Sequence, residues 1–181
     1  MKDIHKYLIA AGFSSVVALT ASQLSAPSEG EVNTPYLDVT HVRTVCYGQT
    51  DDNSSGTKVQ DRKYSDEECV NMLGTELEAK RKEIEPLFKV KLNDYQEAAM
   101  LDFAFNAGVP ALKQSSMLRE FNNGNPEAAC NSLLRWVFAG SCQAGTPDCV
   151  KTPSGKYMLK LQGLVVRREK EMQFCLNGLP K

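Results

Sequence analysis

Three residues near the start of the chain, Glu29, Asp38 and Thr44, carry side chains that could together catalyse a hydrolysis. Eight residues separate the glutamate from the aspartate, and five separate the aspartate from the threonine. Cleavage of a glycosidic bond needs one carboxyl group that carries a proton for the leaving oxygen and one ionised carboxylate that activates water or attacks carbon. Glu29 suits the first role and Asp38 the second, and the Thr44 hydroxyl can hold the attacking water.

Each of these residues also has an ordinary structural explanation. Glu29 can be a solvated charge in a linker, Asp38 a turn-former and Thr44 a strand residue, and spacing alone favours these explanations. The rival acid Glu31 lies at a distance from Asp38 that breaks the pattern, so we expect it at the surface.

The elements around the three residues are expected to form a small β lobe. Residues 35–39 and 42–47 are short β-favouring runs, and a turn-rich stretch follows at 51–56. This pattern predicts a β-hairpin or a three-stranded sheet, with Glu29 where a helix meets that lobe.

The rest of the chain predicts a larger helical lobe, which makes the fold class α+β. Ser65 and Glu68 form a capping box that opens a helix ending before Pro86. Asn93 caps a helix that Gly108 stops. Further helices are expected at 111–122, after Asn125 with Pro126 in the first turn, and at 157–176.

The N-terminal segment has the pattern of an export signal. Lys2 and Lys6 precede residues 7–26, which carry no charge and are long enough to span a bilayer. Glycine, hydroxyl side chains and Gln23 dilute the apolar residues, and Ala26-Pro27 is a poor cleavage site. A cleaved signal peptide and a permanent anchor are alternatives, but we favour a helix that leaves the membrane. The domains are then 1–26 and 27–181, with the latter outside the inner membrane.

Composition limits the partners. The 181 residues suit one catalytic domain, which we expect to be monomeric, and 21 Lys and Arg against 22 Asp and Glu argue against nucleic acid. The six cysteines form no CxxC pair, so a metal site is not expected. Export makes disulfides the better explanation of these cysteines, whereas a cytosolic protein would keep them reduced.

Short motifs follow one another in a characteristic order. They are Ser-Glu-Gly at 28–30 and the segments 35–38, 44–50, 103–108, 116–119, 136–140 and 163–169. This series resembles the phage-type lysozymes of glycoside hydrolase family 24. The Ser-, Gly- and Ala-containing stretch directly before Glu29 most resembles endolysins with a signal-anchor-release helix.

The resemblance implies a lysozyme-like fold and an N-acetylmuramidase without a cofactor. Such an enzyme cuts the β-1,4 bond between N-acetylmuramic acid and N-acetylglucosamine in peptidoglycan glycan strands, for host cell lysis. It implies inversion, with the carboxyl groups about 6.5–9.5 Å apart. It also implies three disulfides, which pair Cys46 with Cys69, Cys130 with Cys175, and Cys142 with Cys149.

Some residues depart from the family or have two explanations. His41 replaces a usual glycine, Arg43 a usual aromatic residue and Gln49 a common histidine. We expect His41 to be a surface loop residue rather than a modulator of the site. Asn106 can cap its helix or line the cleft, and we favour the cap. We expect Trp136 to be a core anchor rather than a platform for sugar, and Arg167 and Arg168 to be ion-pair partners rather than substrate ligands.

Two other functions compete with a muramidase. A lytic transglycosylase can act with the acid alone, and Asp38 and Thr44 argue against it. An inactive wall-binding or membrane-tethered protein would have no reason to keep both carboxyl groups and the threonine.

Overall fold

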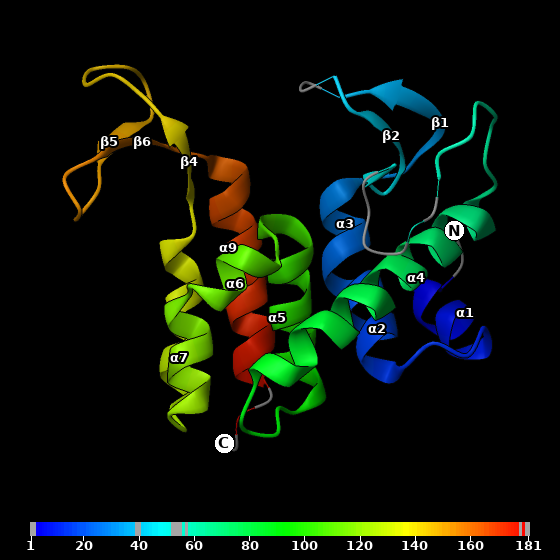
Figure 1. Ribbon diagram of the computed structural model, residues 1–181, viewed down its shortest axis with the longest axis horizontal. Helices are drawn as coiled ribbons and strands as arrows, with labels where there is room; N and C mark the ends of the chain where they lie inside the picture. The colour runs from blue at the N-terminus through cyan, green and yellow to red at the C-terminus, as the bar shows by residue number, and fades with distance from the viewer. Residues whose placement is uncertain (1–2, 39–40, 52–55, 57, 178, 180–181) are drawn as a thin grey trace.

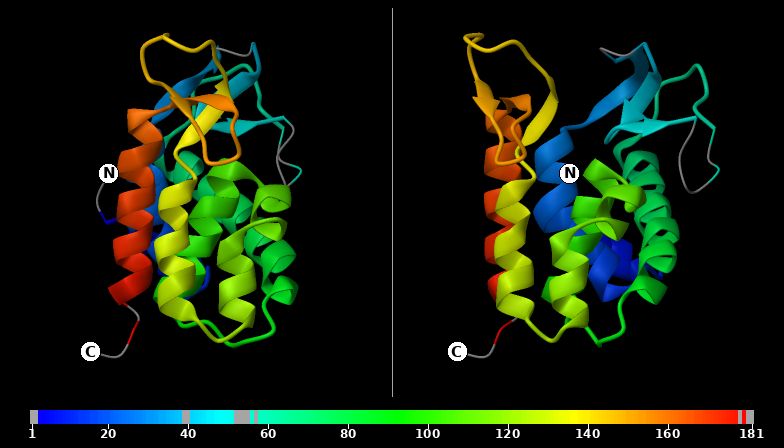
Figure 2. Two further views of the ribbon diagram at one scale, coloured as in Figure 1. Left: turned by 90° about the vertical axis from the view of Figure 1, so that its left-hand side faces the viewer. Right: turned by 60° about the vertical axis from the view of Figure 1, so that its left-hand side comes forward.

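A helical bundle and two small sheets make up the described part of the chain in this computed structural model, which comprises residues 3–38, 41–51, 56, 58–177 and 179. The two sheets stand at one end of the bundle, on opposite sides (Figure 1). The right-hand view of Figure 2 shows the same separation of the two sheets, and both of its views show the helices beneath them. The α+β class with a lysozyme-like helical lobe is confirmed, and the structure adds a second sheet to the one that was predicted.

The first sheet carries Thr44, and Asp38 directly follows its first strand. Its strands β1 (Val32–Leu37), β2 (Arg43–Cys46) and β3 (Gln49–Thr50) are antiparallel and lie in chain order. A two-residue turn joins β2 to β3, and its Gly48 has φ +89°, a backbone conformation that side chains disfavour. The predicted three-stranded sheet is confirmed.

The second sheet corrects the prediction for residues 157–176. Its strands β4 (Phe138–Ser141), β5 (Cys149–Lys151) and β6 (Tyr157–Lys160) are arranged in the order β4-β6-β5. The predicted helix from residue 157 is therefore wrong at its start, and α9 spans Gln162–Asn177. The backbone of β6 pairs with β4 on one side and β5 on the other, and such long-range pairing overrides local helix propensity.

The capping signals located two central helices correctly. Ser65 and Glu68 form a full capping box at the start of α4 (Asp66–Ile84), which a 3₁₀ turn at Glu85–Leu87 follows. Asn93 caps α5 (Asp94–Ala107), which ends at Gly108 with φ +88°. Both predictions are confirmed.

The region after Gly108 forms shorter helices than expected. The single helix predicted at 111–122 is wrong, because Ser115 caps a separate second helix. Asn125 precedes the next helix as predicted, but its side-chain amide donates to Glu120 Oε2 at 3.2 Å instead of capping. The elements are α6 (Val109–Lys113), α7 (Ser116–Asn122), α8 (Pro126–Ser132) and a 3₁₀ turn at Leu133–Arg135.

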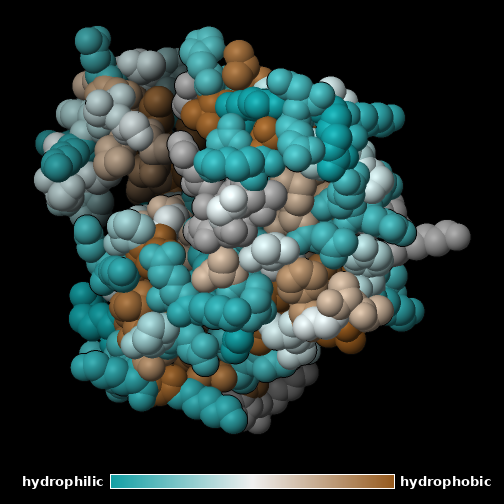
Figure 3. Space-filling model, turned by 45° about the vertical axis from the view of Figure 1, so that its right-hand side comes forward, coloured by the Kyte–Doolittle hydropathy of each residue, from teal (hydrophilic) through white to brown (hydrophobic). Residues whose placement is uncertain are grey.

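The uncharged N-terminal segment is folded into the bundle as a broken helical chain. Its elements are α1 (Ile4–Ala10), α2 (Ser15–Leu19), a π-helical segment (Thr20–Ser25) and α3 (Ala26–Glu29). Six buried apolar side chains of this segment belong to the main core: Leu8, Val16, Val17, Ala18, Ala21 and Ala26. On the side of the molecule that carries α1 and β1, the surface is largely hydrophilic (Figure 3). Among the described residues, no helix is long and apolar enough to cross a membrane.

The polar residues of this segment find partners in the bundle. The Ser14 hydroxyl donates to Glu78 at 3.2 Å, and the Ser25 hydroxyl donates to Asp102 at 2.6 Å. At Gly74 of α4, an added Cβ would lie 2.7 Å from the Leu8 side chain, so the glycine allows α1 to approach closely. Apolar side chains of the segment and the hydroxyls of Ser14 and Ser25 are therefore matched to the folded domain.

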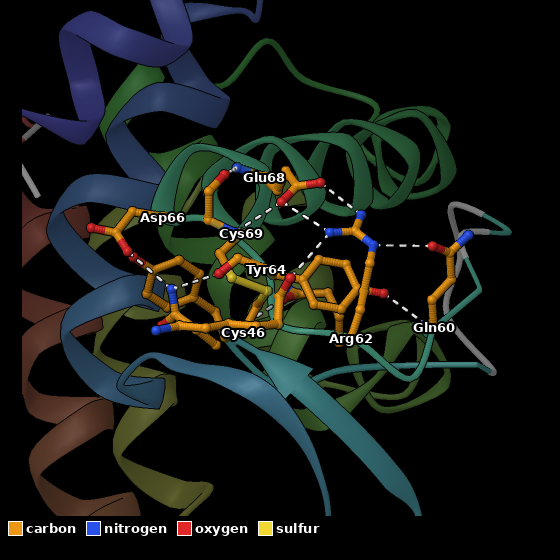
Figure 4. The surroundings of a disulfide bond; sticks show 12 residues. Cys46, Gln60, Arg62, Tyr64, Asp66, Glu68 and Cys69 are labelled. Carbon is orange, nitrogen blue, oxygen red and sulfur yellow. Dashed lines mark hydrogen bonds and ion pairs between the residues drawn. A yellow bond between two sulfur atoms is a disulfide. The ribbon is translucent and has the colours of Figure 1, made fainter.

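All three predicted disulfides are present. Cys46 pairs with Cys69, Cys130 with Cys175, and Cys142 with Cys149. The first bond ties the end of β2 to the first turns of α4, as Figure 4 shows. It therefore fixes the sheet that carries Thr44 onto the helical lobe.

Beside this disulfide, Arg62 binds Glu68 with two hydrogen bonds of 3.1 and 2.6 Å (Figure 4). These bonds, and the bond from the Ser65 backbone, lower the pKa of Glu68 to about 2, against an ordinary value of about 4.3 in the unfolded chain. The folded state thus favours the ionised Glu68 carboxylate. This carboxylate stabilises the fold above the pKa of Glu68 in the unfolded chain, and the stabilisation is lost as the pH falls through the pKa of Glu68 in the folded chain. We expect Glu68→Gln to lower the melting temperature at pH 7, and the difference from wild type to vanish near pH 2.

Glu67→Gln is the matched control for this experiment, because it removes a negative charge from the same first helical turn. A melting-temperature difference for Glu68→Gln that stays constant between pH 7 and pH 2 would contradict the linkage.

Candidate active site

Glu29 lies at the junction between the N-terminal segment and the first sheet. It is the last residue of α3, which Gly30 ends with φ +73°. Its side chain is 26% exposed, and its Oε2 faces the β2–β3 turn, 3.7 Å from where a Cβ of Gly48 would be. The predicted position of Glu29, between a helix and the β lobe, is confirmed.

Arg167 of α9 holds the other oxygen of this carboxyl group. Its Nη1 donates to Glu29 Oε1, and its Nε and Nη2 donate to Asp102 Oδ2 and Oδ1 at 3.2 and 3.1 Å. Burial alone would lower the pKa of Arg167, but the charges and hydrogen bonds of Asp102 and Glu29 raise it above its ordinary value. Arg167 therefore stays charged and presents a fixed donor to Glu29.

Behind this contact, Arg168 and Glu171 extend the buried charges along α9. Glu171 forms ion pairs with Arg168 at 2.9 Å and with Arg167 at 3.5 Å. Burial, reinforced by the charge of Asp102, raises the pKa of Glu171 well above its ordinary value. The two arginines are ion-pair partners as predicted, but sequence reasoning missed that one of them binds the candidate acid.

The prediction for Asn106 was wrong. Asn106 lies in the last turn of α5, and its side-chain oxygen accepts a hydrogen bond from Arg168 rather than capping the helix. Trp136 packs edge-on against the fully buried Phe103, with ring centroids 5.0 Å apart, as expected for a core anchor.

Asp38 and Thr44 meet at Val42, where the chain turns from β1 into β2. The Val42 amide donates to Asp38 Oδ1 at 2.9 Å, and the Val42 carbonyl accepts the Thr44 hydroxyl at 3.0 Å. Asp38 is half-buried, whereas Thr44 is only 4% exposed. The structure thus places both side chains on the backbone of one residue, Val42, directly before β2.

Glu29 approaches the same sheet at another point. Thr44 pairs across the ladder with Thr50 of β3, and the turn between β2 and β3 faces the Glu29 carboxyl group. The β2–β3 hairpin therefore carries Thr44 on its first strand and faces the Glu29 carboxyl group with its turn. In the same lobe, His41 is exposed in the loop after Asp38, which confirms its prediction as a surface residue.

A second carboxyl group near Glu29 was missed by sequence reasoning. Glu76 lies on the buried face of α4, and burial raises its pKa, an effect that the charge of Glu29 reinforces and that Lys80 and Gln49 oppose. Its position three residues after the buried Leu73 is the signal that could have identified it. For Asp102, the signal is a single acid within the apolar run 98–104.

A surface cavity of about 680 Å³ adjoins the Arg167 side of the site. It is lined by residues of α3, α5 and α9, among them Pro27, Ser28, Asn106 and Arg167. The cavity thus opens beside the arginine that binds Glu29, with Glu29 itself outside its lining.

Known proteins match the chain over most of its length. The phage lysozyme family model matches residues 26–171. The SAR-endolysin of bacteriophage PS119 is 30% identical over 176 residues, which cover 94% of this chain and 93% of the relative. The SAR-endolysin of enterobacteria phage P21 is 29% identical over 181 residues, 97% of each chain.

The fold also matches a solved structure, the active form of the P1 phage endolysin Lyz. The TM-score is 0.72 at 21% identity, and the match covers 98% of this chain and 94% of that one. The order of motifs, the arrangement of the lobes and the family match agree. The chain therefore belongs to the phage lysozyme family, as a lysozyme-type endolysin.

Proposed function

We propose that this endolysin hydrolyses the β-1,4 bond between N-acetylmuramic acid and N-acetylglucosamine in peptidoglycan strands, with inversion and without a cofactor. The observation that carries this proposal is the fixed carboxyl group of Glu29, with one oxygen bound by Arg167 and the other facing the hairpin of Thr44. The reaction takes place in the periplasm and serves lysis of the host cell.

Glu29 acts as the general acid through Oε2. Because Arg167 donates to Oε1, the proton belongs on Oε2, the oxygen that faces the β2–β3 turn. This proton passes to the glycosidic oxygen as the bond between that oxygen and the anomeric carbon breaks. The leaving sugar departs with a hydroxyl group, and Glu29 is left as a carboxylate.

Asp38 acts as the general base for the attacking water. The water oxygen bonds to the anomeric carbon from the opposite face, and one water proton passes to the Asp38 carboxylate. The Thr44 hydroxyl already donates its proton to the Val42 carbonyl, so its oxygen can accept a hydrogen bond from that water. Proton transfer back from Asp38 to Glu29 through solvent restores the starting state.

Substitutions in the hairpin test these roles on purified cell walls. We expect Asp38→Asn to lower kcat by about 10²–10⁴-fold, the usual contribution of a general base. Thr44→Val should lower kcat, whereas Thr44→Ser, which keeps the hydroxyl, should retain most of it. Turbidity clearing measures all three rates.

The matched control is His41→Asn in the same loop. His41 is exposed with φ +60°, a conformation that asparagine tolerates, so this variant should clear walls at the wild-type rate. Wild-type clearing by Asp38→Asn would overturn the assignment of the base and favour a transglycosylase that uses the acid alone.

The proposal includes control by the membrane. Residues 7–26 carry no charge and lie in the host inner membrane after export, before the segment leaves the bilayer and folds into the bundle. Support comes from the junction with the site, since only Pro27 and Ser28 separate Ala26 from Glu29. An enzyme held in the membrane then has its acid displaced from the hairpin of Asp38 and Thr44.

A further inference from the structure

A buried chain of hydrogen bonds links the N-terminal segment to the Glu29 carboxyl group. Ser25 of the π-helical segment is fully buried, and its hydroxyl donates to Asp102 Oδ1 at 2.6 Å. Asp102, 1% exposed, accepts two further bonds from Arg167, and Arg167 donates to Glu29. This series of hydrogen bonds therefore links Ser25 to Glu29 through Asp102 and Arg167.

The Ser25 hydroxyl differs from its neighbours in its partner. The hydroxyls of Ser22 and Ser28 donate to carbonyl groups three or four residues earlier in their own helical chain. The Thr20 hydroxyl donates in the same way at 2.8 Å and also reaches the Ala98 carbonyl of α5 at 3.5 Å. A bond within its own helical chain keeps a hydroxyl satisfied wherever the helix is placed. Ser25 instead donates across to α5, so its bond exists only while the segment is seated in the bundle.

Asp102 sets the direction of the Arg167 guanidinium, and the Ser25 hydroxyl is a third donor that holds the Asp102 carboxylate in place. Asp102 Oδ1 accepts both the Ser25 hydroxyl and Arg167 Nη2, so the hydroxyl fixes the carboxylate that orients the guanidinium. Glu171 is a competing acceptor, with its Oε1 3.5 Å from Arg167 Nε. If the Asp102 contact weakens, Arg167 can turn toward Glu171 and release Glu29 Oε1.

We propose that Ser25 and Asp102 are positioning residues for Glu29, through which the seated N-terminal segment aligns the acid. They touch no substrate and act only through the Arg167 guanidinium. This inference rests on the proposed role of Glu29 as general acid. It also gives the membrane control a molecular basis, because a segment in the bilayer withdraws the Ser25 hydroxyl from Asp102.

The test uses the full chain exported with a cleavable signal and measures kcat and KM on purified walls. Ser25→Ala removes one oxygen, and Asp102→Asn keeps the side-chain volume. Both should lower kcat by about 10–100-fold with KM nearly unchanged, since a misplacement of about 1 Å costs up to about 10²-fold. Rates are taken at a temperature where melting curves show every variant folded.

Ser132→Ala is the matched control. Ser132 is also a buried serine, but its hydroxyl donates to Ala128 of its own helix at 2.9 Å. It should show a small change in melting temperature and the wild-type kcat. A kcat for Ser25→Ala that equals that of Ser132→Ala would overturn the inference.

A double-mutant cycle separates positioning from a merely structural role. In an Arg167→Met background, Ser25→Ala should lower kcat no further, because the group through which it acts is gone. Additive losses would overturn the inference. Glu29→Gln is measured alongside: if it is inactive while Ser25→Ala keeps full kcat, only the positioning role fails, whereas an active Glu29→Gln overturns the proposed acid as well.

Discussion

Glu29→Gln is expected to lose clearing of purified cell walls by about 10²–10⁴-fold, the usual contribution of a general acid. Glutamine has nearly the same shape, and its amide oxygen can still accept the hydrogen bond from Arg167. The melting temperature should therefore fall much less than the activity. Turbidity assays and melting curves on the same preparation measure both quantities.

Glu31→Gln provides the control for this prediction. Glu31 is an exposed acid two residues away, and its substitution should leave clearing close to the wild-type rate. Loss of activity in Glu31→Gln together with full activity in Glu29→Gln would mean that the acid has been assigned to the wrong residue.

The second large effect is expected from a more apolar N-terminal segment. Ala10, Ala11 and Gln23 are exposed in the folded bundle, so leucine at all three positions leaves the packed face of the segment unchanged. Leucine favours the bilayer by roughly 0.3–0.6 kcal/mol at each position, so three leucines shift the segment toward the membrane by roughly 1–2 kcal/mol. Host lysis should be delayed, with about tenfold less released enzyme, as cell fractionation and lysis timing can measure.

Two controls make this result specific. Serine at the same three positions should not delay lysis. The leucine variant exported with a cleavable signal in front of Met1, which keeps residues 1–26 in the mature enzyme, should clear walls at the rate of wild type exported in the same way. Lysis by the leucine variant on the wild-type schedule would contradict the release step.

The parts of the fold set by local chemistry were predictable. Capping residues such as Ser65 and Asn93 satisfy the first amides of their helices whatever the surroundings, so α4 and α5 were located correctly. The second sheet was missed because its strands are short and each depends on partners elsewhere in the chain. Residues 157–159 form a short, largely apolar run that suits a helix as well as a strand.

The N-terminal segment shows a second limit of sequence reasoning. An uncharged stretch such as 7–26 is suited to lipid and to a protein core alike, because both environments exclude water. Its hydroxyls predict a helix that can leave the membrane, but the sequence does not show what they bind afterwards. The structure gives Ser14 and Ser25 hydrogen-bond partners in the folded domain.

The site was predictable in its residues but not in its support. Glu29, Asp38 and Thr44 lie close together in sequence, and a local pattern can mark them. Arg167 is 138 residues from Glu29, so only the folded chain shows that it binds the acid. Asp102, a single acid in an apolar helix, indicates that a buried partner exists, but the sequence does not identify that partner.

The most direct test of the central claim is mass analysis of the fragments released from purified peptidoglycan in isotope-labelled water. The account predicts one heavy oxygen on each new reducing end, and every new reducing end on N-acetylmuramic acid, because water attacks its anomeric carbon. Anhydro sugars without the label, or new reducing ends on N-acetylglucosamine, would contradict the account.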